Sequence, residues 1–222
     1  MEQNKERVIP IVDVKGIKFY NDALQQELIE VGNPDNRISA YEMLDLDDHL
    51  EFKFDQETKN VYEGRWDLPV PDHVATVWIR PLAATDPDGM EQFVSDHPHL
   101  DPIEHVYSWP LFNIGGTDFL LDGKYRGFRE VENPWNLIDF KKIELDEPGR
   151  FYFDKQIKNI PFPHELEAYS PFEKLPDHIV QVELPSRQEL IENLRLHEQK
   201  LKRAAADQKS KKTHRRKKGY KF

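Results

Sequence analysis

The chain has 222 residues, with 38% hydrophobic and 11% aromatic residues, no cysteine, and a formal net charge of −10. This length allows one large domain or two small domains of about 100 residues each, and the aromatic content argues against a disordered chain. The lack of cysteine excludes disulfides and thiolate metal sites.

Residues 1–8 form a charged N-terminal arm with no apolar stretch behind it, which argues against a signal peptide. No apolar run anywhere in the chain approaches the roughly 20 residues that a membrane span needs. The sequence therefore predicts a soluble, cytoplasmic protein without a membrane partner.

Short strands are predicted directly after the arm. Residues 8–14 and 17–21 flank Lys15-Gly16, and such a dipeptide between two apolar stretches predicts a β-hairpin. Residues 23–31 fit either a helix or a strand. Their counterpart at 123–131 has two glycines and two aromatic residues, which favours a strand in both places.

A turn and a short helix are predicted next. In Asn33-Pro34-Asp35-Asn36, asparagine side chains can bond nearby backbone and proline presets φ, so the segment predicts a turn. A short helix is expected over Ser39 to Leu46 with Ser39 as its N-cap, and Asp139 is the matching N-cap in the second half.

A further set of strands is predicted before the middle of the chain. Phe52 and Phe54 alternate with charged residues, as in a half-buried strand. Residues 56–59 then turn the chain, and residues 60–63 pair back. Residues 73–79 are rich in β-branched and aromatic residues and predict another strand.

A helix is predicted to close each half. In the first half, Asp86-Pro87 supplies an N-cap and a first-turn proline for a helix to about Val94. In the second half, residues 186–189 form a capping box that starts a helix running to about Lys209. Its apolar stripe consists of Leu190, Leu194, His197 and Leu201.

The two halves of the chain align with each other. Residues 9–38 and 109–138 share ten identities in thirty ungapped positions, where chance would give about two. Three further blocks follow in the same order: 52–55 with 151–154, 59–61 with 158–160, and 70–74 with 175–179. Four collinear blocks make coincidence a negligible explanation, so the sequence predicts an internal duplication.

The predicted fold class is therefore α+β, with two tandem β-rich repeats of about 100 residues. Each repeat has antiparallel strands, a short helix and a closing C-terminal helix. The expected segments are the N-terminal arm 1–8, repeat 1 at 9–95, a linker 96–108, repeat 2 at 109–199 and a basic C-terminal tail 200–222. Because the linker is short and lacks a flexible Gly/Ser stretch, the repeats are expected to pack with pseudo-twofold symmetry.

The residues that both repeats share are mostly of the kinds that make turns and cores. The predicted turn residues are Gly16, Asn33, Pro34 and Asn36 in repeat 1, and Gly116, Asn133, Pro134 and Asn136 in repeat 2. Asp22 and Asp122 fit either a polar pocket or turns and caps, and the turn explanation is favoured.

A shared Asp-His pair occurs in each repeat, as Asp72-His73 and Asp177-His178. A carboxylate next to an imidazole suggests an acid–base dyad. Adjacent residues on a strand point to opposite faces, however, so the pair is better explained as a turn that enters a strand.

The linker offers a candidate metal site. Three histidines and three carboxylates lie within ten residues, and alternating residues of an extended chain share a face. The candidate ligands for a divalent metal are His97, His99 and His105. No known ligand spacing fits them, so a solvated linker is the competing interpretation, and no other cofactor is expected.

The tail is the most distinctive feature of the sequence. Residues 200–222 contain eleven Lys/Arg and one acid, so they carry +10, whereas residues 1–199 carry −20. The candidate binding residues are Lys209, Lys211, Lys212, Arg215, Arg216, Lys217 and Lys218. They can neutralise phosphates with salt-dependent, sequence-independent affinity, and Tyr220 and Phe222 can stack on bases.

Several partners fit such a tail: RNA or DNA, an acidic protein, or the acidic part of the same chain. A solubilising role is a further alternative. No phosphate-binding glycine loop, nucleophile elbow or HExxH motif is present. The sequence therefore favours a non-enzymatic binding or scaffold protein whose tail contacts nucleic acid or an acidic partner. The alternative is a metal-dependent enzyme with a site at the interface of the two repeats, near the histidine-rich linker.

Overall fold

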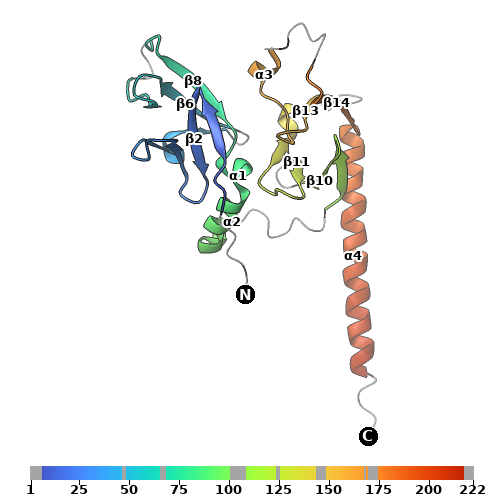
Figure 1. The fold of residues 1–222 in the computed structure, drawn as a ribbon. Helices are drawn as coiled ribbons and strands as arrows, with labels where there is room; N and C mark the ends of the chain where they lie inside the picture. Colours follow the sequence, from blue (N-terminus) through green and yellow to red (C-terminus); the bar gives the residue numbers. More distant parts are fainter. Residues whose placement is uncertain are drawn as a thin grey trace. The chain divides into compact units, whose positions relative to one another are not determined.

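A computed structural model describes residues 7–46, 49–65, 69–100, 109–123, 126–143, 149–167, 169 and 175–217 (Figure 1). The described residues form antiparallel sheets and helices, a mixed α+β architecture dominated by strands, as the sequence predicts. The chain divides into two compact units: unit 1 is Met1–Glu104 with Asn133–Leu137, and unit 2 is His105–Glu132 with Ile138–Phe222. Among the described helices, none is long and apolar enough to cross a membrane.

The first sheet of unit 1 has the order β1-β2-β3-β4, and all its strand pairs are antiparallel. Its strands are β1 (Ile11–Val14), β2 (Ile17–Asp22), β3 (Glu27–Glu30) and β4 (Arg37–Ser39). Lys15 and Gly16 both have positive φ, of 54° and 83°, as a type I′ hairpin turn requires. The predicted hairpin is confirmed, and residues 23–31 hold a strand rather than a helix.

The predicted helix over Ser39 to Leu46 is wrong in length. Only one 3₁₀ turn forms, η1 (Ala40–Glu42), before strand β5 (Leu44–Asp45) begins. The Ser39 side chain accepts a hydrogen bond from the Tyr41 amide, and Glu42 caps the Ser39 amide in return. The N-cap is therefore confirmed. The chain returns to an extended form because Leu44 and Asp45 pair with β6.

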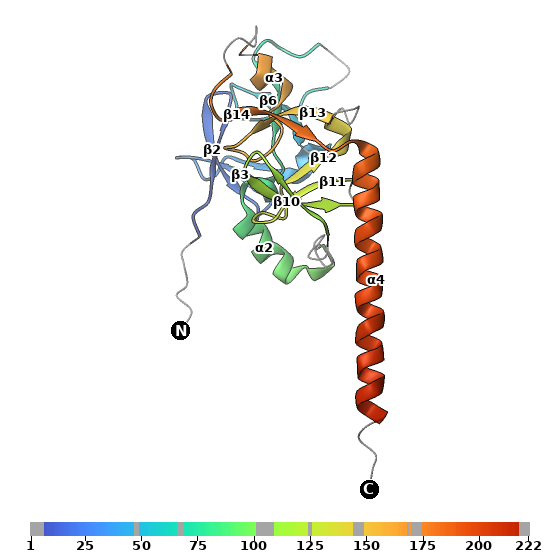
Figure 2. The ribbon, with the colours of Figure 1, turned by 90° about the vertical axis from the view of Figure 1, so that its right-hand side faces the viewer.

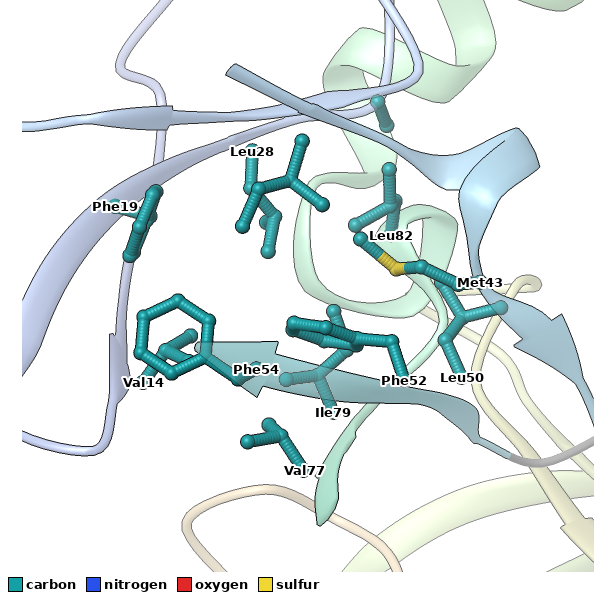
Figure 3. Close-up of a cluster of buried hydrophobic side chains, with 12 residues drawn as sticks. Val14, Phe19, Leu28, Met43, Leu50, Phe52, Phe54, Val77, Ile79 and Leu82 are labelled. Carbon is teal, nitrogen blue, oxygen red and sulfur yellow. The ribbon is translucent and has the colours of Figure 1, made fainter. Parts of the chain in front are cut away.

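The second sheet of unit 1 is built around β6 (Leu50–Asp55), whose side chains alternate strictly between buried and half-buried. It pairs with β5, β7 (Asn60–Val61) and β8 (Val74–Ile79). Figure 3 shows Phe52 and Phe54 of β6 in one apolar core with Phe19 and Leu28 of the first sheet. The two sheets are thus packed together through the phenylalanines that the alternation picked out.

Helices close unit 1. Helix α1 (Leu82–Thr85) is a single turn that the sequence did not predict, and α2 (Pro87–Asp96) follows it. Asp86 caps α2 by accepting a hydrogen bond from the Gly89 amide at 3.0 Å, as predicted. A 3₁₀ turn, η2 (Pro98–Leu100), ends the described part of this segment.

The described strands of unit 2 correspond to β1–β4, β6 and β8 of unit 1. Its first sheet has the order β12-β11-β10-β9, and β13 pairs with β14. The elements are β9 (Leu111–Ile114), β10 (Thr117–Asp122), β11 (Gly127–Glu130), β12 (Leu137–Asp139), η4 (Phe140–Lys142), β13 (Gly149–Asp154), α3 (Pro163–Glu167), β14 (Ile179–Leu184) and α4 (Arg187–Lys217). Asp139 caps η4 through the Lys141 amide, as predicted. Helix α3 was not predicted.

Equivalent details recur in the two halves of the sequence. Phe19 meets Phe54 edge-on with ring centroids 6.1 Å apart, and Phe119 meets Phe153 in the same way at 6.0 Å. The Gly115-Gly116 turn also has two positive φ angles, 59° and 94°. The Asn33 and Asn133 carbonyls each accept a hydrogen bond from the asparagine three residues later, at 3.0 and 2.9 Å. The predicted turn residues therefore do form turns in both places.

Candidate functional site

Helix α4 carries the basic residues that the sequence singled out, and its start is firmly fixed. The Glu189 carboxylate accepts hydrogen bonds from the Ser186 amide at 2.8 Å and the Ser186 hydroxyl at 2.9 Å, while the Ser186 hydroxyl accepts from the Glu189 amide. These bonds from Ser186 lower the pKa of Glu189, although burial opposes them. The predicted capping box is confirmed.

Among the α4 side chains that the structure describes, those in the first turns pack against unit 2. Leu190 is fully buried in the unit 2 core and Leu194 packs against that core. His197 is half-buried, whereas Leu201 is exposed. The predicted apolar stripe thus holds for its first three residues and ends before Leu201.

The helix continues well beyond this contact, as one uninterrupted rod (Figure 2). It was predicted to end near Lys209 but extends to Lys217. No glycine or proline occurs between these residues, and Lys, Arg and Gln are good helix formers. At 1.5 Å per residue, the backbone from Arg203 to Lys217 spans about 21 Å.

The predicted binding residues fall on this extension. The helix backbone includes Lys209, Lys211, Lys212, Arg215, Arg216 and Lys217, while Lys218 lies outside the described residues. Closer to the unit, the side chains of Lys200, Lys202 and Arg203 are exposed. The structure therefore brings the basic residues together on one regular element.

A polar cluster ties the two sheets of unit 1 together. The Lys59 ammonium lies 2.7 Å from the Glu30 carboxylate, and the Asn36 side-chain amide donates to the same carboxylate at 3.0 Å. Asn60 donates to the Asn36 side-chain oxygen at 2.7 Å. The hydrogen bonds from Lys59 and Asn36 lower the pKa of Glu30. These contacts give the shared asparagines a structural role beyond the turn itself.

Unit 2 has the matching ion pair. The Lys158 ammonium lies 2.5 Å from the Glu130 carboxylate and 2.8 Å from that of Glu132. Hydrogen bonds to Glu130 and Glu132 raise the pKa of Lys158. Lys59 and Lys158 also share a left-handed backbone, with φ of 57° and 51°. Sequence reasoning missed this Lys–Glu pair, although all four residues match between the halves.

Asp22 and Asp122 are buried and ion-paired, which goes beyond the turn role favoured from the sequence. Arg7 donates to Asp22 and to Asp86, each at 2.6 Å. Asp22 also accepts from the Gln25 amide at 3.0 Å, so a turn contact is present as well. In unit 2, Arg129 is 3.0 Å from Asp122. Arg7 and Arg129 occupy unrelated positions, so the alignment of the halves gave no signal for them.

The shared histidines face carboxylates other than their neighbours in sequence. His73 Nε2 lies 3.8 Å from Asp55, and His178 Nε2 lies 3.8 Å from Asp154. Burial raises the pKa of Asp55, but the Thr58 and Glu57 amides, together with His73, lower it overall. The Asp72-His73 dyad, which the sequence analysis disfavoured, gains no support, because His73 lies close to Asp55 at the end of β6.

The histidine-rich linker is described only in part. The His97 and His99 rings lie 6.3 Å apart, and His97 Nδ1 is 2.9 Å from the Phe93 carbonyl while its ring stacks on Phe93. His105 lies outside the described residues. Within the described ranges, no group of three or more potential ligands is placed to hold a metal. The metal site stays a prediction.

Comparisons with known proteins add no family. No protein-family model matches the chain, and no curated protein or solved structure shows significant similarity to it.

Proposed function

We propose that this chain is a non-enzymatic binding protein that holds nucleic acid through its basic C-terminal tail, residues 200–222. The observation that carries this proposal is α4: a capped helix anchored by Leu190 and Leu194 that continues to Lys217. A regular helix aligns its cationic residues along one axis. Such an array suits phosphates repeated along a strand, whose binding releases counterions.

We further propose that units 1 and 2 are copies of one α+β repeat, derived by duplication. The equal strand order, the paired phenylalanines, the type I′ turns and the Lys–Glu pairs support common origin. On this view the repeats form the scaffold, and the basic tail at residues 200–222, which follows the second repeat, binds the partner.

The test compares the full chain with a variant in which the seven basic residues Lys209, Lys211, Lys212, Arg215, Arg216, Lys217 and Lys218 are changed to glutamine. Glutamine retains helix propensity, so the charge is removed without breaking α4. Binding of a labelled single-stranded RNA and a DNA duplex is measured by fluorescence anisotropy over a salt series. If about six phosphates are neutralised, the duplex slope of log K against log salt is about −5.

The matched control changes seven lysines of the acidic part, such as Lys15, Lys18 and Lys53, and leaves the tail intact. We expect it to bind nucleic acid as the unaltered chain does, while the tail variant loses at least a hundredfold in affinity at low salt. Equal binding by both variants, or stronger binding of polyglutamate than of nucleic acid, would overturn the proposal. The second result would point instead to an acidic protein partner.

A further inference from the structure

Unit 1 displays an exposed apolar surface that its fold does not require. Tyr41 is 84% exposed, Leu44 is 54% exposed and Leu46 is 39% exposed, all within six residues after the Ser39 cap. The capping box and the β5–β6 pairing hold the first two of them in place. These side chains are therefore presented on ordered structure.

This surface continues across the second sheet. Leu44 lies opposite Glu51, and Glu51 lies opposite Trp78, so the three side chains share one face of the sheet. The Trp78 indole donates to the Glu51 carboxylate at 2.6 Å, and the His49 ring packs 5.1 Å from the Trp78 ring. We call this surface the Trp78 face and define it as Tyr41, Leu44, Leu46 and Trp78, with the acids Glu42 and Glu51.

Unit 2 has charges at the equivalent places. Arg150 and Glu183 correspond to Glu51 and Trp78, and they form an exposed ion pair at 2.8 Å. Lys141 takes the place of Tyr41 in the aligned sequence. Strands β13 and β14 thus pair with charged residues where β6 and β8 have Glu51 and Trp78, so this strand pairing does not account for Trp78.

The chemistry of the Trp78 face indicates its occupant. Its apolar centre has an acidic rim, which favours a cationic segment that also carries aromatic residues. The chain contains one such segment: residues 209–222 hold eight Lys/Arg, no acid, and both Tyr220 and Phe222.

We propose that the Trp78 face of one molecule binds the basic C-terminal segment, residues 209–222, of a second copy of the chain. Such a contact is heterologous, so it links molecules into rings where its rotation closes and into open chains where it does not. Nucleic acid and the Trp78 face then compete for the same segment, so free nucleic acid disassembles the chains.

The test uses sedimentation velocity of the full-length protein at low salt, without nucleic acid. One variant grafts the unit 2 charges onto unit 1, as Glu51→Arg with Trp78→Glu. Because β13 and β14 carry this pair, we expect the variant to fold. A second graft, Tyr41→Lys with Leu44→Glu, replaces the two most exposed apolar residues of the face by charges and leaves β6 and β8 unchanged. The matched control is Leu111→Ala, which shortens a similarly exposed leucine in unit 2.

The unaltered chain and the Leu111→Ala control should show concentration-dependent association, and both grafts should weaken it at least about tenfold. A graft variant mixed with the tail-to-glutamine variant should give heterodimers, because the graft variant keeps the basic segment and the tail variant keeps the Trp78 face. Monomeric behaviour of the unaltered chain, or association that survives both grafts, would overturn the proposal. Loss of association in the grafts but not in the tail variant would overturn the choice of occupant. Nucleic-acid binding by the grafts is read separately and reports only on the proposed function.

Discussion

The two units neutralise a buried aspartate in different ways. Each buries an aspartate at the end of the second strand, Asp22 in β2 and Asp122 in β10. Unit 1 takes the counter-ion from the N-terminal arm, where Arg7 is shared with Asp86, while unit 2 takes it from the neighbouring strand through Arg129. In both units an arginine therefore neutralises this aspartate, although it comes from the N-terminal arm in one unit and from a neighbouring strand in the other. In unit 1 the ion pairs of Arg7 therefore hold the N-terminal arm against the folded unit.

The largest predicted effect comes from Arg129→Met. The Arg129 side chain is only 4% exposed and that of Arg7 is 18% exposed. Removing one partner of a buried ion pair costs about 3–5 kcal/mol, so Arg129→Met should destabilise unit 2 by this amount. Arg7→Met should cost unit 1 less, because water reaches that pair. Urea denaturation with amide exchange resolved by unit measures both losses.

A control for that comparison is the double variant Arg129→Met with Asp122→Asn, which removes both charges. It should recover part of the stability lost in Arg129→Met. An Arg7→Met loss that equals or exceeds the Arg129→Met loss would show that exposure does not govern the difference between the units.

The next effect concerns the helix that follows the last strand of each unit. Leu82 at the start of α1 and Leu190 in α4 are both buried. Truncation of a buried leucine costs about 2–5 kcal/mol, and Leu190→Ala should in addition lower the amide protection of α4 residues 190–201. Leu82→Ala should leave α4 unchanged. Leu201→Ala is the exposed control and should shift stability by less than about 0.5 kcal/mol. Unaltered protection of α4 in Leu190→Ala would contradict the anchoring role of Leu190.

A smaller effect is expected at the caps. Ser186 caps a helix of 31 residues, whereas Ser39 caps a single 3₁₀ turn. Loss of such a cap costs about 1 kcal/mol in a helix, so Ser186→Ala should reduce α4 helicity, measured by circular dichroism. Ser39→Ala should leave the helical signal unchanged. Ser186→Thr keeps the hydroxyl and should restore most of the helicity.

Local chemistry explains which elements the sequence predicted correctly. The hairpin turns, the four N-caps and the alternating phenylalanines depend on neighbours within a few residues, and these features are present. The boundaries of the Ser39 helix and of α4 were wrong. Strand pairing with β6 ended the first early, and an unbroken run of good helix formers extended the second.

Contacts between distant residues explain what the sequence did not give. Arg7 pairs with Asp86 across 79 positions, and nothing in local patterning marks such a pair. The Lys–Glu pairs were present as identities between the halves, yet identity alone does not reveal which residues touch. The Trp78 face had a readable signal, because apolar residues in one half stand where charged residues stand in the other. That signal lies in the differences between the halves rather than in what they share.

The smallest predicted effect is a pH dependence that differs between the units. The lowered pKa of Glu30 stabilises unit 1 above the unfolded-state pKa of about 4.3, and this contribution disappears as the pH falls through the lower folded-state pKa. The raised pKa of Lys158 stabilises unit 2 below about pH 10.4, and this contribution disappears as the pH rises through the higher folded-state pKa. Both lysines are partly exposed, 46% for Lys59 and 34% for Lys158, so solvent screens the pairs.

Substitution of each lysine separates these two contributions, which form the acid limb and the alkaline limb of the plot of stability against pH. Lys59→Met should reduce the stability of unit 1 at neutral pH and flatten its acid limb, because Glu30 then loses the partner that holds its pKa low. Lys158→Met should flatten the alkaline limb of unit 2 and leave the acid limb of unit 1 unchanged. Unfolding midpoints measured from pH 2 to 12, with amide exchange resolved by unit, check both results. An alkaline limb of unit 2 that persists in Lys158→Met would assign it to other groups and remove the contrast between the units at this pair.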